Sequence, residues 1–213
     1  MATWILDNRR LTQTEQTINA TNIYNIFSTW GWSLNAIAGM LGNMVSESTI
    51  GPGVVEGHAT NNPPNRGYGL IQWTDSKATN VHNNPLWSWT YRNYGNYDWQ
   101  DGDHQCVFIN SDDRYNWIST KNYPLSYSQF QTSDESPEYL ARAYFYNRER
   151  GTWDSGRETQ ARYWYDYFNG IPPEPPKPVE PPDPPIDPNP PTPENRYKKM
   201  PLYMYPGYNC RLY

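Results

Sequence analysis

The sequence predicts a mainly α-helical domain of the α+β class with little sheet, followed by a proline-rich C-terminal extension. Apolar residues recur at helical spacing over residues 12–30 and 34–48, and helix-start signals return after residue 135. Thirteen of the 22 residues from 172 to 193 are proline, which excludes a helix or a central strand there. We therefore expect a folded domain at residues 1–170, a linker at 171–193 and a short tail at 194–213.

The first two helices are predicted from capping residues and apolar stripes. Thr12 and Glu15 have the spacing of a capping box, and Gly31 interrupts the first apolar pattern. Ser33 is suited to cap a second helix that runs to about Ser48. We expect the Gly-Pro-Gly sequence at residues 51–53 to end that helix.

The middle of the chain has weaker signals. Residues 54–66 are predicted to form a polar loop, and the glycine-rich stretch 67–73 is too short for a helix. We predict a strand or extended turn at 67–73, whose glycines allow close approach of backbone or ligand. Residues 74–135 are expected to be loop-rich, with short helices near 83–92 and 103–118.

Two more helices are predicted at the end of the domain. The sequence SPE at residues 136–138 combines a cap, a proline at the first helical position and an acid in the first turn. This helix should run to about Arg148. Ser155 and Glu158 have capping-box spacing before the last helix, and Gly170 closes the domain.

Composition excludes several classes of protein. The net charge is −5 with both signs scattered, whereas a nucleic-acid binder presents a basic face. No apolar stretch approaches the length of a membrane span, and the first ten residues lack the apolar core of a secretory signal. The ten tryptophans and nineteen tyrosines are too many to bury completely, so some are available to a sugar-binding groove and most should form an aromatic core.

Glu47 is the first candidate for chemistry. It lies in the last turn of an otherwise apolar helix, where the partial negative charge of the helix end disfavours a carboxylate. Met44 and Met40, one and two turns back, would reduce its solvation, so both effects predict a raised pKa. A carboxyl group that stays protonated near neutral pH can donate a proton to a glycosidic oxygen. The alternative is a solvated carboxylate at a helix end.

Three ordered motifs indicate a family. The segment AIAGMLGNMVSES at residues 36–48 resembles the active-site helix of phage tail lysozymes, which are peptidoglycan-cleaving domains at the tail tips of phages. The segment GYGLIQWT at 67–74 resembles that family's G-x-G-L-x-Q-W-T motif. The segment AYFYNRER at 143–150 resembles its late aromatic helix, in which a Phe precedes a Glu by about one turn.

The resemblance runs from about Thr12 to Phe168 and implies a lysozyme-like fold. It implies that the chain cleaves the bond between N-acetylmuramic acid and N-acetylglucosamine, with Glu47 as the general acid. It also implies that Gln72 and Trp73 line the groove with Tyr68 beside them, although Trp73 suits a core position equally well. Glu149 and Arg150 would be structural, through an ion pair or buried hydrogen bonds near the groove wall.

A second catalytic carboxylate is not identified by any motif. The candidates are Glu56, Asp75, Asp98 and Asp101. An inverting enzyme requires a base roughly 6.5–9.5 Å from the acid, and a retaining enzyme a nearer nucleophile. We rank Glu56 first, because it follows the Glu47 helix most closely.

Metal and thiol chemistry receive little support. His58, His82 and His104 are far apart in sequence, no H-E-x-x-H motif is present, and the acids near residue 100 lack calcium-loop spacing. We therefore expect no metal and no cofactor. Cys106 would need an activating histidine, and His104 is badly spaced for that role on a helix. Whether Cys106 and Cys210 pair is left open, with free thiols favoured.

Two alternatives to a hydrolase stay open. One is a structural or wall-binding virion module that kept the lysozyme fold. The other is a lytic transglycosylase, which cleaves the same bond but forms an anhydro-sugar. The linker and the tyrosine-rich tail favour attachment of residues 171–213 to other phage tail proteins, which would place the chain in the virion, acting on the host cell wall. Neither nucleic acid nor membrane is expected as a partner.

Overall fold

A computed structural model describes residues 3–59, 66–74, 85–96, 98–111 and 113–170. Contacts divide the chain into two units, Met1–Glu174 and Pro175–Tyr213. The predicted linker and tail at 171–213 lie outside the described residues. Within the described part, the predicted mainly helical fold is confirmed, and none of its helices is long and apolar enough to cross a bilayer.

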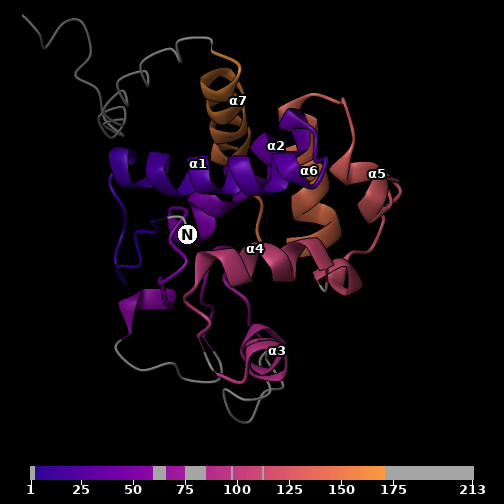
Figure 1. Cartoon of the computed structure of the whole chain (residues 1–213). Helices are drawn as coiled ribbons and strands as arrows, with labels where there is room; N and C mark the ends of the chain where they lie inside the picture. Colours follow the sequence, from indigo (N-terminus) through magenta and orange to yellow (C-terminus); the bar gives the residue numbers. More distant parts are fainter. Residues whose placement is uncertain (1–2, 60–65, 75–84, 97, 112, 171–213) are drawn as a thin grey trace, which may run out of the picture. The chain divides into compact units, whose positions relative to one another are not determined.

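Helix α2 (Leu34–Ser48) is the central element of the domain. It packs most extensively against α7 (Gly156–Phe168) and α6 (Pro137–Tyr144), and α1 (Gln13–Thr29) also contacts it (Figure 1). The predicted cap at Ser33 is present, because its hydroxyl oxygen accepts the N–H of Ala36. The predicted capping box of Thr12 and Glu15 is present as well.

Two glycines let the neighbours of α2 approach closely. A Cβ on Gly39 would lie 2.9 Å from backbone atoms of α6, and a Cβ on Gly42 would overlap the carbonyl oxygen of Arg157 on α7. Real Cβ atoms do not tolerate such contacts, so both helices require glycine at these positions of α2. The close approach of α7 brings its first turn beside the end of α2.

The second half of the domain contains shorter elements. Helices α3 (Pro85–Tyr94) and α4 (Gly102–Ser111) confirm the helical segments predicted near 83–92 and 103–118, although the second ends earlier and is followed by the turn η3 (Asp113–Asn116). A short helix, α5 (Tyr127–Gln131), was not predicted. Helix α6 continues as a π-helical turn, η4 (Phe145–Glu149), so the predicted end near residue 148 is correct.

One local prediction needs correction. The side chain of Ser155 does not cap α7, because the Ser155 backbone is itself helical (φ −65°, ψ −18°) and Oδ1 of Asp154 accepts the N–H of Gly156 instead. The predicted end of α2 near Ser48 is correct, and the chain leaves the helix through Thr49 and Ile50, which both adopt positive φ. Of the strand or extended turn predicted at 67–73, the structure has the turn, with isolated bridges that join Tyr68 to Val55 and to Trp73.

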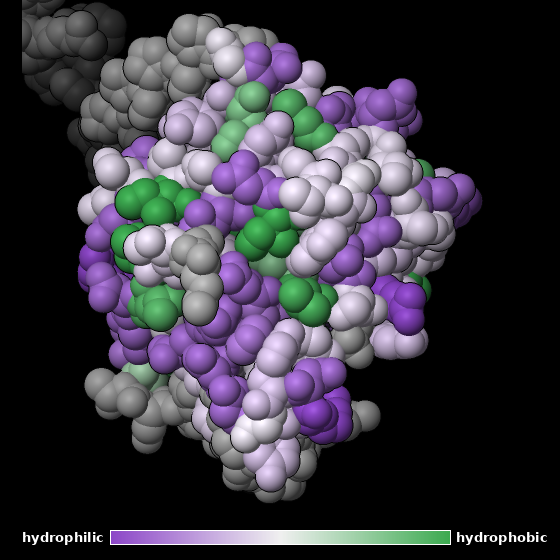
Figure 2. Space-filling view, in the orientation of Figure 1, coloured by the Kyte–Doolittle hydropathy of each residue, from purple (hydrophilic) through white to green (hydrophobic). Residues whose placement is uncertain are grey.

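The aromatic residues mainly build the core, as predicted. The buried tryptophans are Trp32, Trp73, Trp89, Trp99 and Trp164. On the face shown in Figure 2, hydrophobic residues form separate spots among hydrophilic ones rather than one continuous patch. Most of the large aromatic side chains in the described part of the chain thus lie in the core or pack against it.

Candidate active site

Glu47 lies between two cavities at the end of α2. The smaller, of about 190 Å³, extends towards η1 (Glu56–His58), and the larger, of about 390 Å³, extends towards η4 and α7. Glu47 and Gln72 line both cavities. The side chain of Glu47 is 21% exposed, so its carboxylate is accessible to a molecule bound on either side.

The carboxylate of Glu47 is held by a buried arginine. The Nη2 atom of Arg157 lies 2.6 Å from Oε1 of Glu47, and its Nη1 donates to Oδ1 of Asn43 at 2.9 Å. The guanidinium also lies over the ring of Phe145, 4.9 Å from its centroid. The apolar surroundings expected for Glu47 are not found, because Met40 and Met44 are buried in the core and the carboxylate contacts a cation.

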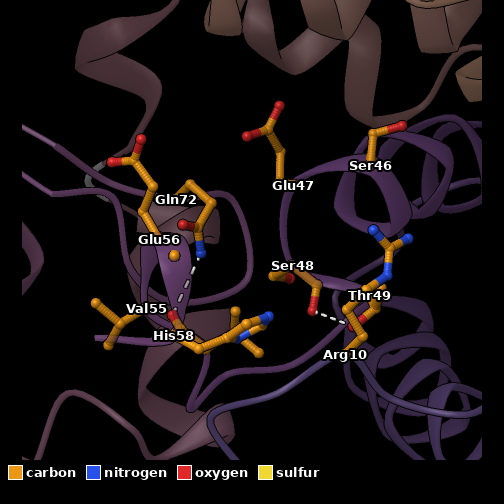
Figure 3. A pocket seen from close by; sticks show the side chains of 11 residues that line it. Arg10, Ser46, Glu47, Ser48, Thr49, Val55, Glu56, His58 and Gln72 are labelled. Carbon is orange, nitrogen blue, oxygen red and sulfur yellow. Dashed lines mark hydrogen bonds between the residues drawn. The ribbon is translucent and has the colours of Figure 1, made fainter. Parts of the chain in front are cut away.

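The smaller cavity brings Glu56 to the same site as Glu47 (Figure 3). Glu56 is exposed, and its Oε2 accepts the backbone N–H of Gly67 at 3.2 Å. Asp98 and Asp101 line neither of these two cavities, and Asp75 lies outside the described residues. Among the described candidates for a second carboxylate, Glu56 is thus the one that shares a cavity with Glu47.

Gln72 holds the turn on which it lies. Its backbone has a φ of 51°, and its side-chain Nε2 donates to the carbonyl oxygens of Val54 and Gly69 at 3.2 and 3.0 Å. The amide N–H groups are therefore used within the protein, and the side chain still lines both cavities. That Gln72 binds substrate stays a prediction.

Gln105 is a buried support of the same turn that the sequence analysis did not identify. Its Oε1 accepts the N–H of Leu70 at 2.8 Å, and its Nε2 donates to the carbonyl oxygens of Pro52 and Trp99. Because Gln105 is completely buried on α4, its bond to Leu70 fixes the turn against α4, and the other two bonds tie the same side chain to Pro52 and Trp99. No local pattern marks such a residue.

Tyr68 and Trp73 lie deeper than expected. Tyr68 is completely buried, with its ring edge-on to Trp99, and it lines neither cavity. Trp73 is 2% exposed and donates its indole N–H to Oδ1 of Asp113 at 3.3 Å, while part of its side chain borders the larger cavity. Tyr68 is thus a core residue under the groove, because the tight turn directs its ring inward.

The larger cavity is lined by three consecutive charged residues, Arg148, Glu149 and Arg150. Arg148 forms the ion pair of this wall, since its Nε lies 2.6 Å from Oδ2 of the fully buried Asp113. Arg150 is exposed and adopts a φ of 60°. The ion pair that was expected of Arg150 at this wall is formed by Arg148 instead. Neither Arg148 nor Asp113 was predicted.

Glu149 is a carboxyl group of this cavity with one oxygen enclosed by protein atoms. Its Oε1 is shut off from solvent and has no hydrogen-bond partner among the described residues. Burial raises its pKa to about 8; the cations Arg148 and Arg157 counteract this rise, and the negative charge of Glu47 adds to it. The resemblance implied only a structural role for Glu149.

The metal alternative has one candidate group of side chains among the described residues. The ligand atoms of Asp98, Asp101 and His104 lie within 4.8 Å of one another, away from both cavities. Local contacts account for this grouping, because Asp101 accepts the backbone N–H of His104 and the imidazole is stacked on Tyr94.

Cys106 is fully buried and burial raises the pKa of its thiol well above the usual value, which opposes a nucleophilic role. Cys210 lies outside the described residues.

Comparison with known proteins agrees with this arrangement. The sequence model of a family described as phage tail lysozyme matches residues 18–168. The chain is 35% identical over 165 residues to Morphogenesis protein 1 of Bacillus phage B103. That alignment covers 76% of this chain and 42% of the relative, so the chain spans less than half of the relative's length. The family match covers Glu47, the turn at 67–73 and Arg157, and the chain therefore belongs to the phage tail lysozyme family.

Proposed function

We propose that this chain cleaves the glycan strand of bacterial peptidoglycan between N-acetylmuramic acid and N-acetylglucosamine, with Glu47 as the general acid. The observation that carries this proposal is that Glu47 lines both cavities. A glycan occupying both would place sugar units on either side of this carboxyl, where a general acid must lie to reach the oxygen that joins them. Membership of the phage tail lysozyme family supports the same reaction class.

Arg157 supports the proposed role of Glu47 in the second half of the step. Proton donation to the glycosidic oxygen leaves a carboxylate on Glu47 as the bond between the anomeric carbon and that oxygen breaks. The guanidinium at 2.6 Å stabilises this carboxylate through a charge-assisted hydrogen bond. Because Asn43 also binds Arg157, the cation stays in place when Glu47 is protonated.

We propose Glu56 as the carboxylate that activates the attacking water. It is exposed and shares the smaller cavity with Glu47, so water has access to it. Gln72 would contribute to substrate binding through its place on both cavities, with Trp73 forming part of the wall. The proposed mechanism uses no metal and no cofactor.

The substitution Glu47→Gln tests the assignment of the acid. It keeps the shape of the side chain and removes the proton donor, so we expect release of muropeptides from purified cell walls to fall by about 10²–10⁴-fold. Glu138→Gln is a matched control, because Glu138 also pairs with an arginine, Arg162, at 2.6 Å but lines neither cavity. Full activity of Glu47→Gln would contradict the proposal and favour a structural or wall-binding module.

The mass of the products separates hydrolysis from transglycosylation. Hydrolysis adds one water at each cut and leaves a free reducing end, whereas a lytic transglycosylase forms an anhydro-sugar that is one water lighter. We expect the heavier product, because Glu56, the carboxylate that we propose to activate water, lines the smaller cavity with Glu47. Anhydro products from the wild-type chain would exclude the role proposed for Glu56 and retain that of Glu47.

We further propose that the chain is part of the phage tail and that residues 171–213 attach it to other virion proteins, so that it acts on the host cell wall. The name of the relative from phage B103, a morphogenesis protein, supports a place in particle assembly. Deletion of residues 194–213 should abolish incorporation into particles, measured by immunoblotting of purified virions. Unchanged incorporation would refute the attachment role and leave the proposed chemistry unaffected.

A further inference from the structure

Glu149 is a second carboxyl group at the larger cavity, whereas Glu56 lines the smaller one. It lies at the end of the π-helical turn η4, directly before Arg150, whose backbone is left-handed. Both Glu47 and Glu149 line this cavity. An orphaned, buried carboxyl oxygen costs stability unless the structure uses it, so Oε1 of Glu149 requires an explanation.

The charged groups that act on Glu149 come from its own turn and from three other elements. Arg148 lies on its own turn, Asp113 on η3, Arg157 on α7 and Glu47 on α2, and all four influence its ionisation. Tyr144, at the end of α6, is buried and interacts with the same charges. Neighbouring carboxyl groups retain a proton between them more readily than isolated ones do, because their negative charges repel, and here the cations Arg148 and Arg157 oppose this effect.

We propose that Glu149 is a positioning residue that stores the proton which Glu47 delivers to the glycosidic oxygen. This inference rests on the proposed function of Glu47. It explains how Glu47, which is ion-paired with Arg157 in the free protein, is supplied with a proton when substrate binds. It also accounts for the unpartnered Oε1 of Glu149, because a protonated carboxyl carries no negative charge that this oxygen would have to hold without a donor.

The proposed step conserves protons and electrons. Glu149 gives its proton to a water molecule in the 390 Å³ cavity, and that water passes a proton to the carboxylate of Glu47. Glu47 then gives the proton to the glycosidic oxygen, which keeps the electron pair of the broken bond to the anomeric carbon. Glu47 returns to its ion pair with Arg157, the carboxylate of Glu149 is stabilised by Arg148 and Arg157, and Glu149 recovers a proton from solvent.

The pH profile of muropeptide release tests this role in the full chain. In the wild type we expect activity to decline with a midpoint near pH 8, where Glu149 loses its proton. Glu149→Gln preserves the size and the hydrogen-bond donor of the neutral acid but cannot transfer a proton. We expect its rate at pH 7 to be about 10–100-fold lower and its alkaline limb to move below pH 8, with Glu149→Asp partly restoring both. Glu138→Gln should leave the profile unchanged.

Two further measurements exclude a merely structural effect. Glu149→Gln should bind insoluble cell walls as the wild type does, and its unfolding temperature at pH 5 should not be lower. In the wild type, carbon-detected nuclear magnetic resonance should find one glutamate carboxyl that titrates near pH 8, and Glu47→Gln should lower that pKa by removing the neighbouring negative charge. This titration needs no active enzyme.

The outcomes distinguish the two proposals. If Glu47→Gln is inactive but Glu149→Gln keeps the wild-type rate and alkaline limb, Glu149 stores no proton and only this inference fails. If Glu47→Gln cleaves cell walls normally, the assignment of the acid fails and the proton store fails with it. Absence of a carboxyl that titrates near pH 8 would also overturn the inference, whatever the activity of the variants.

Discussion

The two sides of the groove hold glutamates in opposite environments. On the side of the smaller cavity, Glu56 is exposed and its carboxylate accepts a backbone N–H. On the side of the larger cavity, Glu149 has a shielded oxygen without a partner, and burial raises its pKa to about 8. The same side chain is thus suited to activate water on one side and to hold a proton on the other. Solvation, rather than residue type, makes this difference.

Substitution of Arg157, the cation that pairs with Glu47, should have the largest effect on the free energy of unfolding. Arg157→Leu removes the partner of Glu47 and leaves the buried Oδ1 of Asn43 unpaired. We expect the free energy of unfolding to fall by about 3 kcal/mol, measured by urea denaturation. The control Arg162→Leu removes an ion pair that is more exposed, at 43% and 32% of the two side chains, and should cost at most about 1 kcal/mol. Equal losses would show that the two pairs have similar environments.

The pH dependence of stability should separate Glu149 from Glu56. A carboxyl whose pKa rises from 4.5 to about 8 on folding binds its proton more tightly in the folded protein. Stability therefore falls as the pH increases from about 4.5 to 8. Glu149→Gln should remove this fall and be more stable than the wild type at pH 8 by about 2 kcal/mol, since one pKa unit corresponds to about 1.4 kcal/mol and the side chain is only partly buried. Thermal unfolding at pH 5 and pH 8 measures the difference. If the difference in stability between the wild type and Glu149→Gln is the same at pH 5 and at pH 8, the raised pKa of Glu149 is contradicted.

The stability of the domain around Glu149 should also depend on Gly42, the glycine of α2 against which α7 packs. Gly42→Ala places a Cβ against the carbonyl oxygen of Arg157 and should destabilise the domain by about 1–3 kcal/mol. It should also displace Arg157 from Glu47 and lower activity. Gly151→Ala is the control, because its Cβ would meet only one ring atom of Phe145, at 3.9 Å. Similar unfolding midpoints for the two variants would argue against close packing of α2 on α7.

Substitution of the exposed Glu56 should have the smallest effect on stability. Glu56→Gln keeps an acceptor for the N–H of Gly67, so we expect the free energy of unfolding to change by no more than about 0.5 kcal/mol. Activity should still fall by about 10²-fold or more if Glu56 activates water. Assays of muropeptide release beside denaturation curves separate the two effects. Unchanged activity would leave Glu47 without a carboxylate partner on this side.

Local sequence predicted the elements that carry the site. The caps at Thr12 and Ser33, the helix that presents Glu47 and the sharp turn at 67–73 are all encoded within a few residues of where they occur. Capping hydrogen bonds and apolar periodicity act over one or two helical turns, so they can be recognised without knowledge of the fold. The same reasoning failed for Ser155, because its backbone is already helical and Asp154 accepts the N–H of the first helical residue instead.

Only the tertiary structure decided the surroundings of each candidate. Arg157 lies 110 residues after Glu47 in the chain, and the two meet because α7 packs on the glycines of α2. Packing likewise buried Tyr68 in the core, placed Glu56 at the groove and enclosed Glu149 beside Arg148. The sequence by itself thus determined which helix presents Glu47 and where that helix ends. The charge around this carboxyl depends on desolvation and on contacts between distant segments, which no local pattern contains.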